Sequence, residues 1–344
     1  MRNQRYDKYN LSVQRPHLVL IGAGASRAAF PNGEKYRLRL PLMNDFFDIV
    51  EGLSDYLEKH GIGYKNKNFE DLYSSMYENS KYNEIRTNIE EIVYNYFGRM
   101  ELPNEPTLYD HLILSMTGRD AIATFNWDPF IGQAMCRNYK RVGGNNNLPR
   151  PIYLHGNTAV GVCTRHRQVQ VGPKGIICRK CRKRLEKSKL LYPIEKKNYN
   201  SDPFIKSSWH DVRSYLQDAF MFTIFGYGAP SSDVEAIKLL QEGWGNKYQR
   251  VMEEIEVIDI LEEDLLCEKW GTFIHSHHYS THKDFYLSSI ARFGRRSCDA
   301  QFQRIYNCIE LVDNSLPKYA NWDELDEWLK PLLEEENTKR ERRN

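Results

Sequence analysis

Polar side chains follow two short apolar runs near the middle of the sequence. Residues 121–125 form a run typical of a buried strand, and Asn126 lies in the turn-forming stretch directly after it. A second run, 151–154, ends at His155 and Asn157. Because ligands in open α/β sheets bind at the carboxyl ends of the strands, an imidazole and a carboxamide could converge on one crevice. The alternative is a histidine with a purely structural role at a strand end, and the two runs alone favour it.

A cluster of cysteine and histidine residues follows. Cys163 and His166 are separated by two residues, Cys178 and Cys181 likewise, and eleven residues lie between the two pairs. This spacing is typical of a structural zinc site, in which four side chains hold one tetrahedral ion. Disulfide pairing is disfavoured, because no secretory signal is expected and the number of cysteines is 7, an odd count. A water could replace His166 in the zinc shell, since its two arginine neighbours fit a solvated basic loop equally well.

Two glycine-rich turns follow other apolar runs and could bind the phosphates of a nucleotide. The first follows residues 17–21 and contains Gly22, Ala23, Gly24 and Ser26. The second follows residues 220–225 and contains Gly226, Tyr227 and Gly228. Glycine lets the backbone approach a pyrophosphate, and the amides of the helix expected after the first turn would point at its negative charge. Tight turns between a strand and a helix also need glycine for steric reasons alone.

The surrounding sequence predicts an α/β framework that would position these residues. Strand-like runs alternate with helical stretches, and helices are expected at 109–116, 209–219 and 234–240. A further strand, 255–260, carries Asp259, which could meet a ribose hydroxyl or be a plain surface acid.

The domain organisation follows from the same patterns. Apolar residues recur at steps of three and four between positions 45 and 106, which predicts a helical insertion that could cap the cleft. An amphipathic helix is expected at 322–333. The expected units are an N-terminal arm at 1–16, a main domain at 17–333 that includes the helical insertion 45–106 and a zinc module at 160–190, and a charged, disordered tail at 334–344.

Length and composition exclude several classes of protein. The 344 residues carry a net charge of +2, which argues against a protein that coats polyanions with its whole surface. No apolar run approaches the roughly 20 residues needed to span a bilayer, so no membrane partner is expected. Seven cysteines without a disulfide framework fit a reducing compartment, and we expect a soluble, cytoplasmic protein.

One segment departs from this overall charge balance. Between Cys163 and Lys189, ten Lys and Arg residues oppose only Glu186; they are Arg165, Arg167, Lys174, Arg179, Lys180, Arg182, Lys183, Arg184, Lys187 and Lys189. A basic zinc module can contact nucleic acid or an acidic protein surface. A solvated loop that keeps a small module soluble is an equal alternative, since no aromatic residues interleave the basic ones for base stacking.

Taken in order, these residues resemble the sirtuin superfamily. Residues 22–26 look like its first nucleotide turn, 124–128 like its asparagine motif, 154–156 like the motif of its catalytic histidine, and 226–233 like its later NAD-contacting turn. The cysteine and histidine cluster lies where sirtuins carry a zinc module. The resemblance covers roughly residues 18–259 and implies an α/β fold: a doubly wound, Rossmann-like parallel sheet with a helical insertion and a small zinc-binding module.

The segment after the first turn departs from the protein deacylases of this superfamily. They continue with Gly-Ile-Pro-Asp-Phe-Arg, whereas residues 27–33 read Arg-Ala-Ala-Phe-Pro-Asn-Gly. This pattern is more similar to the sirtuin-like NADases of bacterial antiphage defence, which hydrolyse NAD+ to nicotinamide and ADP-ribose. Many of those lack a cysteine-rich module, so an NAD-dependent protein deacylase or ADP-ribosyltransferase is one alternative. A non-enzymatic nucleotide-sensing module is another.

The resemblance implies roles for the residues of the cleft. Asn126 would orient a water and the ribose hydroxyls of the substrate NAD+, and His155 would act as general base, since an ordinary histidine is largely neutral at cellular pH. Asp128 would hold the turn or a ribose hydroxyl. The glycine-turn amides would hold the pyrophosphate, and Ser26 would add a hydroxyl contact. The zinc ion would be structural.

The resemblance also implies regulation by partners. Free NADase activity would be toxic, so we expect a silent form that is activated by assembly or infection. The expected partners are an ATPase, a nuclease or a phage-derived activator, and the chain is expected to form a homo-oligomer.

Overall fold

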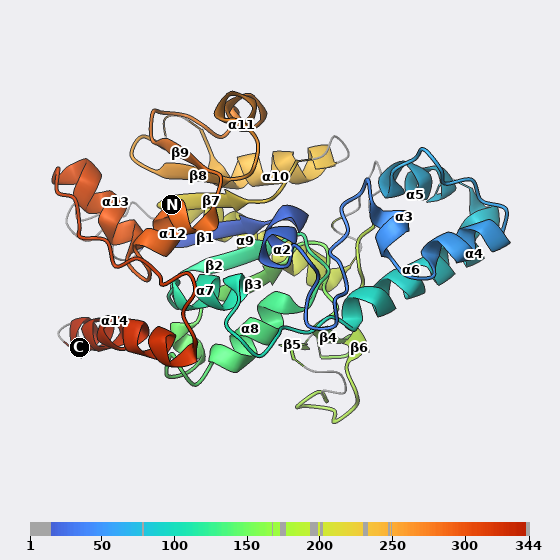
Figure 1. Ribbon diagram of the computed structural model, residues 1–344, viewed down its shortest axis with the longest axis horizontal. Helices are drawn as coiled ribbons and strands as arrows, with labels where there is room; N and C mark the ends of the chain where they lie inside the picture. Colours follow the sequence, from blue (N-terminus) through green and yellow to red (C-terminus); the bar gives the residue numbers. More distant parts are fainter. Residues whose placement is uncertain are drawn as a thin grey trace.

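A parallel sheet of six strands forms the centre of the protein, in the order β3-β2-β1-β7-β8-β9 (Figure 1). The computed structural model describes residues 15–341, apart from residues 78, 167, 173–176, 193–198, 200–201, 230–232, 247 and 249. The strands of the sheet are β1 His17–Ile21, β2 Ala121–Thr124, β3 Arg150–Tyr153, β7 Met221–Phe225, β8 Glu254–Ile258 and β9 Tyr279–His282. The N-terminal arm predicted at 1–16 lies outside the described residues except for its last two.

The strand order is that of a doubly wound sheet. β1 pairs in parallel with β2 on one side and with β7 on the other, so Val19 lies opposite both Ile122 and Thr223. The chain builds one half of the sheet outward from β1 to β3 and then returns to build the other half from β7 to β9. The predicted fold class is confirmed. Open sheets of this kind bind ligands where the strand order reverses, which here is between β1 and β7.

The helices cover both faces of the sheet or lie beside it. They are α2 Ala23–Ala29, α3 Phe46–Ile49, α4 Leu53–Lys59, α5 Phe69–Tyr77, α6 Asn83–Gly98, α7 Leu108–Leu114, α8 Phe130–Asn138, α9 Pro203–Asp218, α10 Val234–Trp244, α11 Glu263–Trp270, α12 Ser289–Arg292, α13 Ser297–Tyr306 and α14 Trp322–Glu341. Short 3₁₀ turns are η1 Ser80–Tyr82, η2 Asn145–Asn147 and η4 Phe285–Leu287. Within the described part of the chain, none of the helices is both long and apolar enough to cross a bilayer.

Alternate residues of the strands enter two separate cores. Leu18 and Leu20 of β1 pack on one face of the sheet with side chains of α9, α10 and α11. Val19 and Ile21 face the other side and join a core with α7 and α8. Successive side chains of a strand point to opposite faces, and both faces are buried here. The strands therefore appear in the sequence as continuous apolar runs rather than alternating ones.

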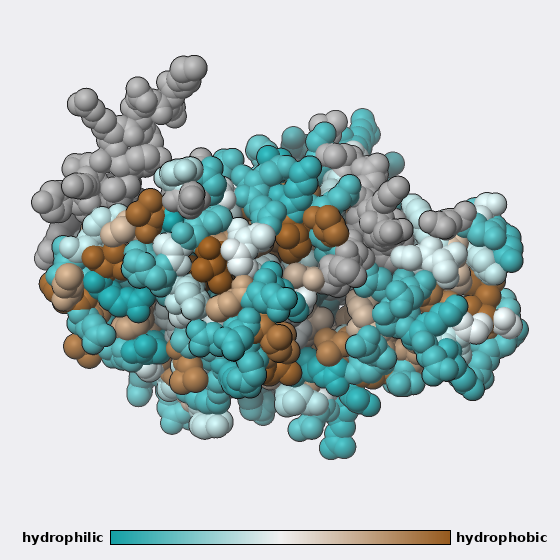
Figure 2. Space-filling view, turned by 90° about the horizontal axis from the view of Figure 1, so that it is seen from above, coloured by the Kyte–Doolittle hydropathy of each residue, from teal (hydrophilic) through white to brown (hydrophobic). Residues whose placement is uncertain are grey.

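Helices α3 to α6 form a lobe beside the sheet, at the right of Figures 1 and 2, within the stretch where a helical insertion is predicted. The apolar stripe that starts the insertion is split between two helices. The first, α3, ends before Val50, whose backbone is extended, and Gly52 takes a left-handed φ of +78° directly before α4. Phe46 and Leu57 of the stripe are buried, whereas the outward surface of the lobe is mainly hydrophilic (Figure 2).

A second, smaller sheet carries the cysteine and histidine cluster. Its three antiparallel strands are β4 Val160–Cys163, β5 Gln168–Val171 and β6 Glu186–Lys187, in the order β5-β4-β6. They lie within residues 160–190, the range predicted for a zinc module.

Two features at the C-terminal side differ from the sequence pattern. Strand β9 was not predicted, because its residues Tyr-Ser-Thr-His lack apolar character and form a partly exposed edge of the sheet. Helix α14 runs eight residues beyond the predicted 322–333, so the prediction of a disordered tail at 334–344 is wrong up to residue 341. The extension of α14 has no apolar periodicity, because it is held to the rest of the protein by a contact between charged side chains. Arg295, which is buried, donates two hydrogen bonds to the carboxylate of Glu336, at 2.6 and 2.9 Å.

Candidate functional site

A cavity of about 440 Å³ lies at the carboxyl ends of five strands of the main sheet, β1, β2, β3, β7 and β8. Its lining includes every sequence-predicted catalytic and ligand-binding residue: Gly22, Ala23, Gly24, Ser26, Asn126, Asp128, His155, Gly226, Tyr227, Gly228 and Asp259. The volume falls within the range of about 300–1,000 Å³ that is usual for small-molecule sites. The cavity lies at the reversal of strand order, where ligands of doubly wound sheets bind.

The helical lobe and the segment that leads into it supply the opposite wall of the cavity. This wall is mostly apolar and includes Leu40, Pro41, Leu42, Met43, Phe46 and Phe97. Trp127 contacts it, with its ring at right angles to Phe46 and Phe97, at centroid distances of 6.3 and 5.7 Å. Sequence patterns indicated these residues only as core, because an apolar stripe that lines a cavity has the same period as one that packs fully.

The two glycine turns pack directly against each other. The Gly22 amide donates to the Phe225 carbonyl at 3.0 Å, and the Gly24 amide donates to the Gly226 carbonyl at 2.9 Å. A Cβ on Gly24 would lie 2.9 Å from the Gly226 Cα, and one on Gly226 would lie 2.2 Å from the Ala25 nitrogen. Glycine is therefore required for contact between the turns. The expectation that these amides hold a pyrophosphate is wrong for Gly22 and Gly24, because both amides are already paired within the protein.

Asn126 is held in a single orientation. Its Nδ2 donates to the Gly22 carbonyl at 2.9 Å and to Ser26 Oγ at 2.7 Å, and its backbone amide donates to Thr124 Oγ1 at 2.9 Å. A carbonyl oxygen can only accept, so the contact with Gly22 fixes which end of the carboxamide is the nitrogen. Both amide protons are then used within the protein. Oδ1 is the atom that Asn126 can offer to a ligand.

A buried hydrogen-bonded chain continues from Ser26 to Asp128. Ser26 Oγ donates to Asp128 Oδ2 at 2.7 Å and lies 2.6 Å from the hydroxyl of Tyr109. Because Ser26 gives its only proton to Asp128, Tyr109 is the donor to Ser26. Burial raises the pKa of Asp128 from 3.8 to about 6, and the hydrogen bond from Ser26 limits the rise. Tyr109 was missed in the sequence because it lies in a helix whose apolar pattern indicates core.

Asp128→Asn is expected to stabilise the fold near neutral pH. The folded-state pKa of Asp128 is raised, so its contribution to stability is present below the unfolded pKa and is lost as the pH rises through about 6. A rise from 3.8 to about 6 corresponds to at most about 3 kcal/mol. Urea denaturation should give the variant a free energy of unfolding about 1–3 kcal/mol higher at pH 7.5, and the difference should disappear below the unfolded pKa of 3.8. A variant that is no more stable than the parent at pH 7.5 would contradict this expectation.

His155 lies between aromatic rings at the end of β3. Its ring meets Phe125 edge-on at 4.7 Å and stacks on Tyr199 at 5.9 Å, with Nε2 3.5 Å from the Tyr199 hydroxyl. The next residue, Gly156, has φ +77°, and a Cβ there would come within 1.9 Å of the Lys189 carbonyl oxygen. The backbone turn that places the imidazole therefore needs glycine at this position.

Asn157 joins the histidine loop to the asparagine turn. Its Nδ2 donates to the carbonyls of Asn126 and Asp128, at 3.1 and 2.6 Å, and its Oδ1 accepts from the Ala159 amide at 2.9 Å. The sequence pattern suggested that a carboxamide near His155 could reach the crevice. Asn157 is buried outside the cavity lining, so its carboxamide positions the two loops.

The four predicted zinc ligands meet at one point in the small sheet. Cys163 Sγ lies 3.7 Å from His166 Nδ1 and 3.8 Å from Cys181 Sγ, and Cys178 Sγ lies 3.6 Å from His166 Nδ1. All four ligand atoms lie within 4.8 Å of one another. A tetrahedral zinc ion with Zn–S bonds of about 2.3 Å requires ligand atoms about 3.8 Å apart, so the arrangement fits zinc. Four protein ligands leave no open position, which is typical of a structural site.

Cys178→Ser is expected to remove most of the bound zinc and to lower the melting temperature. Purified parent protein should contain about one zinc per chain, because folding energy in such modules comes from the metal. Metal analysis and thermal denaturation measure the two effects. Cys308→Ser, which changes an exposed cysteine outside the cluster, is the control and should leave both unchanged. His166→Ala should be milder if water replaces the ring, and full zinc content in Cys178→Ser would refute the site.

The fold and the cavity define a doubly wound α/β protein with a cavity at its switch point and an attached Cys₃His module. No protein-family model matches the sequence, and a search of the curated proteins gives no match. Among solved structures, the chain is similar to a Sir2 homologue in complex with NAD, with 14% identity and a TM-score of 0.40 over 97% of each chain. It is also similar to a structure described as the basis for the mechanism and regulation of Sir2 enzymes, with 13% identity and a TM-score of 0.37 over 82% of this chain and 93% of that one. A third, Sir2Tm bound to a propionylated peptide, gives 14% identity and a TM-score of 0.32 over 80% and 91% of the two chains. Similarity of this degree assigns no activity to the chain.

Proposed function

We propose that the chain hydrolyses NAD+ to nicotinamide and ADP-ribose in the cavity at the strand ends. The observation that carries the proposal is the convergence of Asn126, Asp128 and His155 on one cavity between two glycine turns. The order of these residues in the sequence also resembles that of sirtuin-like NADases. The Sir2 homologue to which the chain is similar was solved with NAD.

The reaction breaks the bond between C1′ of the ribose and the pyridine nitrogen. The bonding electron pair leaves with nicotinamide, positive charge develops on the ribose, and the oxygen of a water bonds to C1′. Asn126 orients this water or the ribose hydroxyls through Oδ1, because its Nδ2 protons are held by Gly22 and Ser26. His155 accepts the proton that the water loses.

The polar and apolar walls of the cavity suit different parts of this substrate. The strand ends offer Asp128 and Asp259 for ribose hydroxyls, whereas Ser26 Oγ uses its proton and both lone pairs within the protein. The apolar wall of the helical lobe, together with the ring of Trp127, excludes bulk water from the bond that breaks. The pyrophosphate is held by donors other than the amides of Gly22 and Gly24, which are paired with β7 and its turn.

The zinc-ligand geometry favours one second candidate, an NAD-dependent protein deacylase or ADP-ribosyltransferase that uses the same cavity. Many sirtuin-like NADases lack a cysteine-rich module, whereas Cys163, His166, Cys178 and Cys181 fit one here. An acyl-lysine peptide would then be needed for the release of nicotinamide.

The biological setting that we propose is antiphage defence. The protein would deplete NAD+ as a cytoplasmic effector, silent until it assembles into a homo-oligomer or meets a partner ATPase, a nuclease or a phage-derived activator. Depletion of a common coenzyme harms the cell that makes the enzyme, so activity has to depend on such a signal.

The test is incubation of the purified protein with NAD+, alone and with candidate activators, followed by chromatography of the products. Nicotinamide and ADP-ribose in equal amounts without added peptide would support the proposal. Release of nicotinamide only when an acyl-lysine peptide is present would establish the deacylase instead. Binding of NAD+ without turnover under every condition would indicate a nucleotide-sensing module and contradict both enzymatic functions.

A further inference from the structure

A closed turn at the tip of the small sheet concentrates positive charge. We call residues 178–184 the basic knuckle; its cations are Arg179, Lys180, Arg182, Lys183 and Arg184. The Cys178 amide donates to the Lys183 carbonyl at 2.8 Å, and the Arg182 amide donates to the Cys178 carbonyl at 2.9 Å. Arg182 has φ +61°, which turns the chain back on itself. The knuckle is thus ordered by its own backbone and by two cysteines that belong to the metal cluster.

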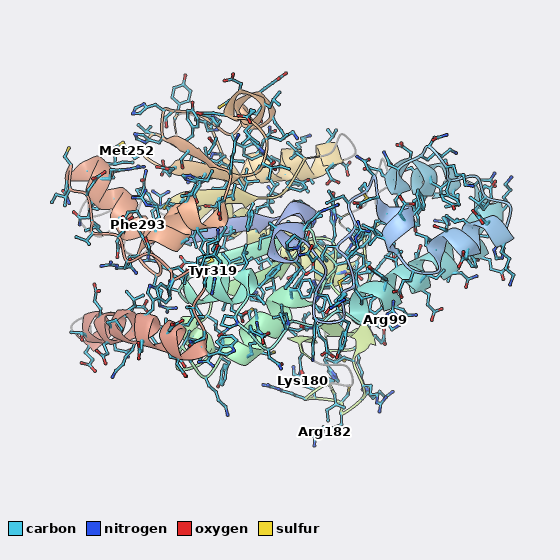
Figure 3. The ribbon with its side chains drawn as sticks, in the orientation of Figure 1. Arg99, Lys180, Arg182, Met252, Phe293 and Tyr319 are labelled. Atoms are coloured by element: carbon cyan, nitrogen blue, oxygen red, sulfur yellow. The ribbon has the colours of Figure 1, made fainter. Side chains whose placement is uncertain are left out.

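The charged groups of the basic knuckle face solvent and have no partners of opposite charge among the residues that the structure describes. All five cations are exposed, and within the described part of the chain none of them forms an ion pair. Figure 3 shows Lys180 and Arg182 at the outer edge of the small sheet, pointing away from the rest of the protein. Exposed ion pairs are the ordinary way to neutralise such charges, so this turn keeps a concentrated positive potential.

The distribution of charge along the chain reinforces this local field. Residues 163–189 contain ten Lys and Arg and one Glu, a charge of +9, so the remaining residues carry −7 within a total of +2. This segment therefore carries an excess of positive charge in a chain whose other residues are net negative. A polyanion would be drawn to this segment.

The composition of the basic knuckle indicates the kind of polyanion. It contains no aromatic residue on which an unpaired base could stack, which disfavours single strands. It also contains no tryptophan or tyrosine, which with arginine are the residues enriched in protein hot spots, so a protein partner would find arginine here but no aromatic anchor. Arginine and lysine side chains on a rigid turn are suited to phosphate oxygens, which position a protein on a duplex without reading its sequence.

We propose that the basic knuckle binds the phosphate backbone of double-stranded nucleic acid, independently of sequence. This function does not depend on the chemistry proposed for the cavity. Non-specific contacts of this kind have dissociation constants of about 10⁻⁶ to 10⁻⁴ M at physiological salt and weaken as salt is raised. A duplex encountered by the protein would be held at the small sheet, whose strands begin three residues after Asn157.

The experiment measures binding of the full chain to a fluorescent 30-base-pair duplex, as DNA and as RNA, by anisotropy at several salt concentrations. The triple variant Lys180→Glu, Arg182→Glu and Lys183→Glu should weaken binding by at least about tenfold at low salt. The plot of log affinity against log salt should become shallower by about 3, because each phosphate contact to DNA contributes a slope of about 0.9. The matched control, Lys59→Glu, Lys67→Glu and Lys81→Glu in the helical lobe, makes the same change in net charge and should alter affinity less than about twofold.

Three outcomes would overturn the proposal. Absence of duplex binding by the parent at 50 mM salt, or an equal loss in the control, would show that the knuckle is a solvated loop. Tighter binding to poly-glutamate than to either duplex would assign the surface to an acidic protein. Zinc content, measured for all three proteins, distinguishes loss of binding from loss of the module. Comparison of the DNA and RNA duplexes identifies which helix the protein prefers.

Discussion

Asn126→Ala and His155→Ala are each expected to reduce NAD+ hydrolysis by about 10²–10⁴-fold, the usual contribution of a positioned acid–base or orienting group. Asn126 can offer only Oδ1 to the cavity, because Gly22 and Ser26 hold its amide protons, so its loss removes the acceptor that orients water or ribose. His155 supplies the imidazole at the adjacent strand end. Initial rates of nicotinamide release under activating conditions measure both effects.

The matched control for this experiment is His210→Ala, which removes an exposed imidazole on α9 and should leave the rate unchanged. Thermal denaturation must accompany the assay, since His155 also packs on Phe125 and Tyr199. If nicotinamide release survived in a folded double variant at Asn126 and His155, the proposed site would be wrong.

Gly226→Ala is expected to destabilise the whole fold by about 3 kcal/mol or more. Its Cβ would lie 2.2 Å from the Ala25 nitrogen and 2.5 Å from the carbonyl carbon of Gly24, and its φ of +60° is unfavourable for any side chain. The clash is with backbone atoms, which cannot move aside as the end of a flexible side chain can. Urea denaturation monitored by circular dichroism measures the loss.

Gly228→Ala is the control for this second prediction. Gly228 lines the same cavity two residues later, but a Cβ there would have nothing within 4 Å. The Gly228→Ala variant should be as stable as the parent. If Gly226→Ala and Gly228→Ala were equally stable, the steric account would be wrong. Gly24→Val should behave like Gly226→Ala and fail in folding, since its Cβ would come within 2.9 Å of the Gly226 Cα.

The parts of the fold that the sequence predicts are those in which one strong physical signal acts alone. Buried parallel strands such as β1 and β7 are continuous apolar runs, and their order, together with the turns that follow them, indicates the doubly wound sheet. The zinc ligands are equally visible, because four ligating side chains at fixed spacing have few other uses. Strand β9 and the last turns of α14 give no such signal. The first is polar and at an edge, and the second is held by the pairing of Glu336 with a distant arginine.

The candidate site was visible in sequence only where loops supply it. Asn126 and His155 interrupt apolar runs with polar residues and so stand out. Tyr109 and the lobe residue Phe46 do not, since both sit in apolar stripes whose period is the same for a core and for a cavity wall. The use of the Gly22 and Gly24 amides could not be predicted either, because it depends on a contact between turns that are about two hundred residues apart in the chain.

The contact between the two turns also restricts how this sequence can diverge. Gly22, Gly24 and Gly226 exclude each other's side chains, so no one of them can be replaced unless both loops are rebuilt together. A Cβ at Gly228 would have open space around it, so other residues can replace this glycine without a steric clash. Descendants of this chain that acquire new ligands should therefore vary Gly228 and the lobe wall, and keep the three interlocked glycines even where the original chemistry has been lost.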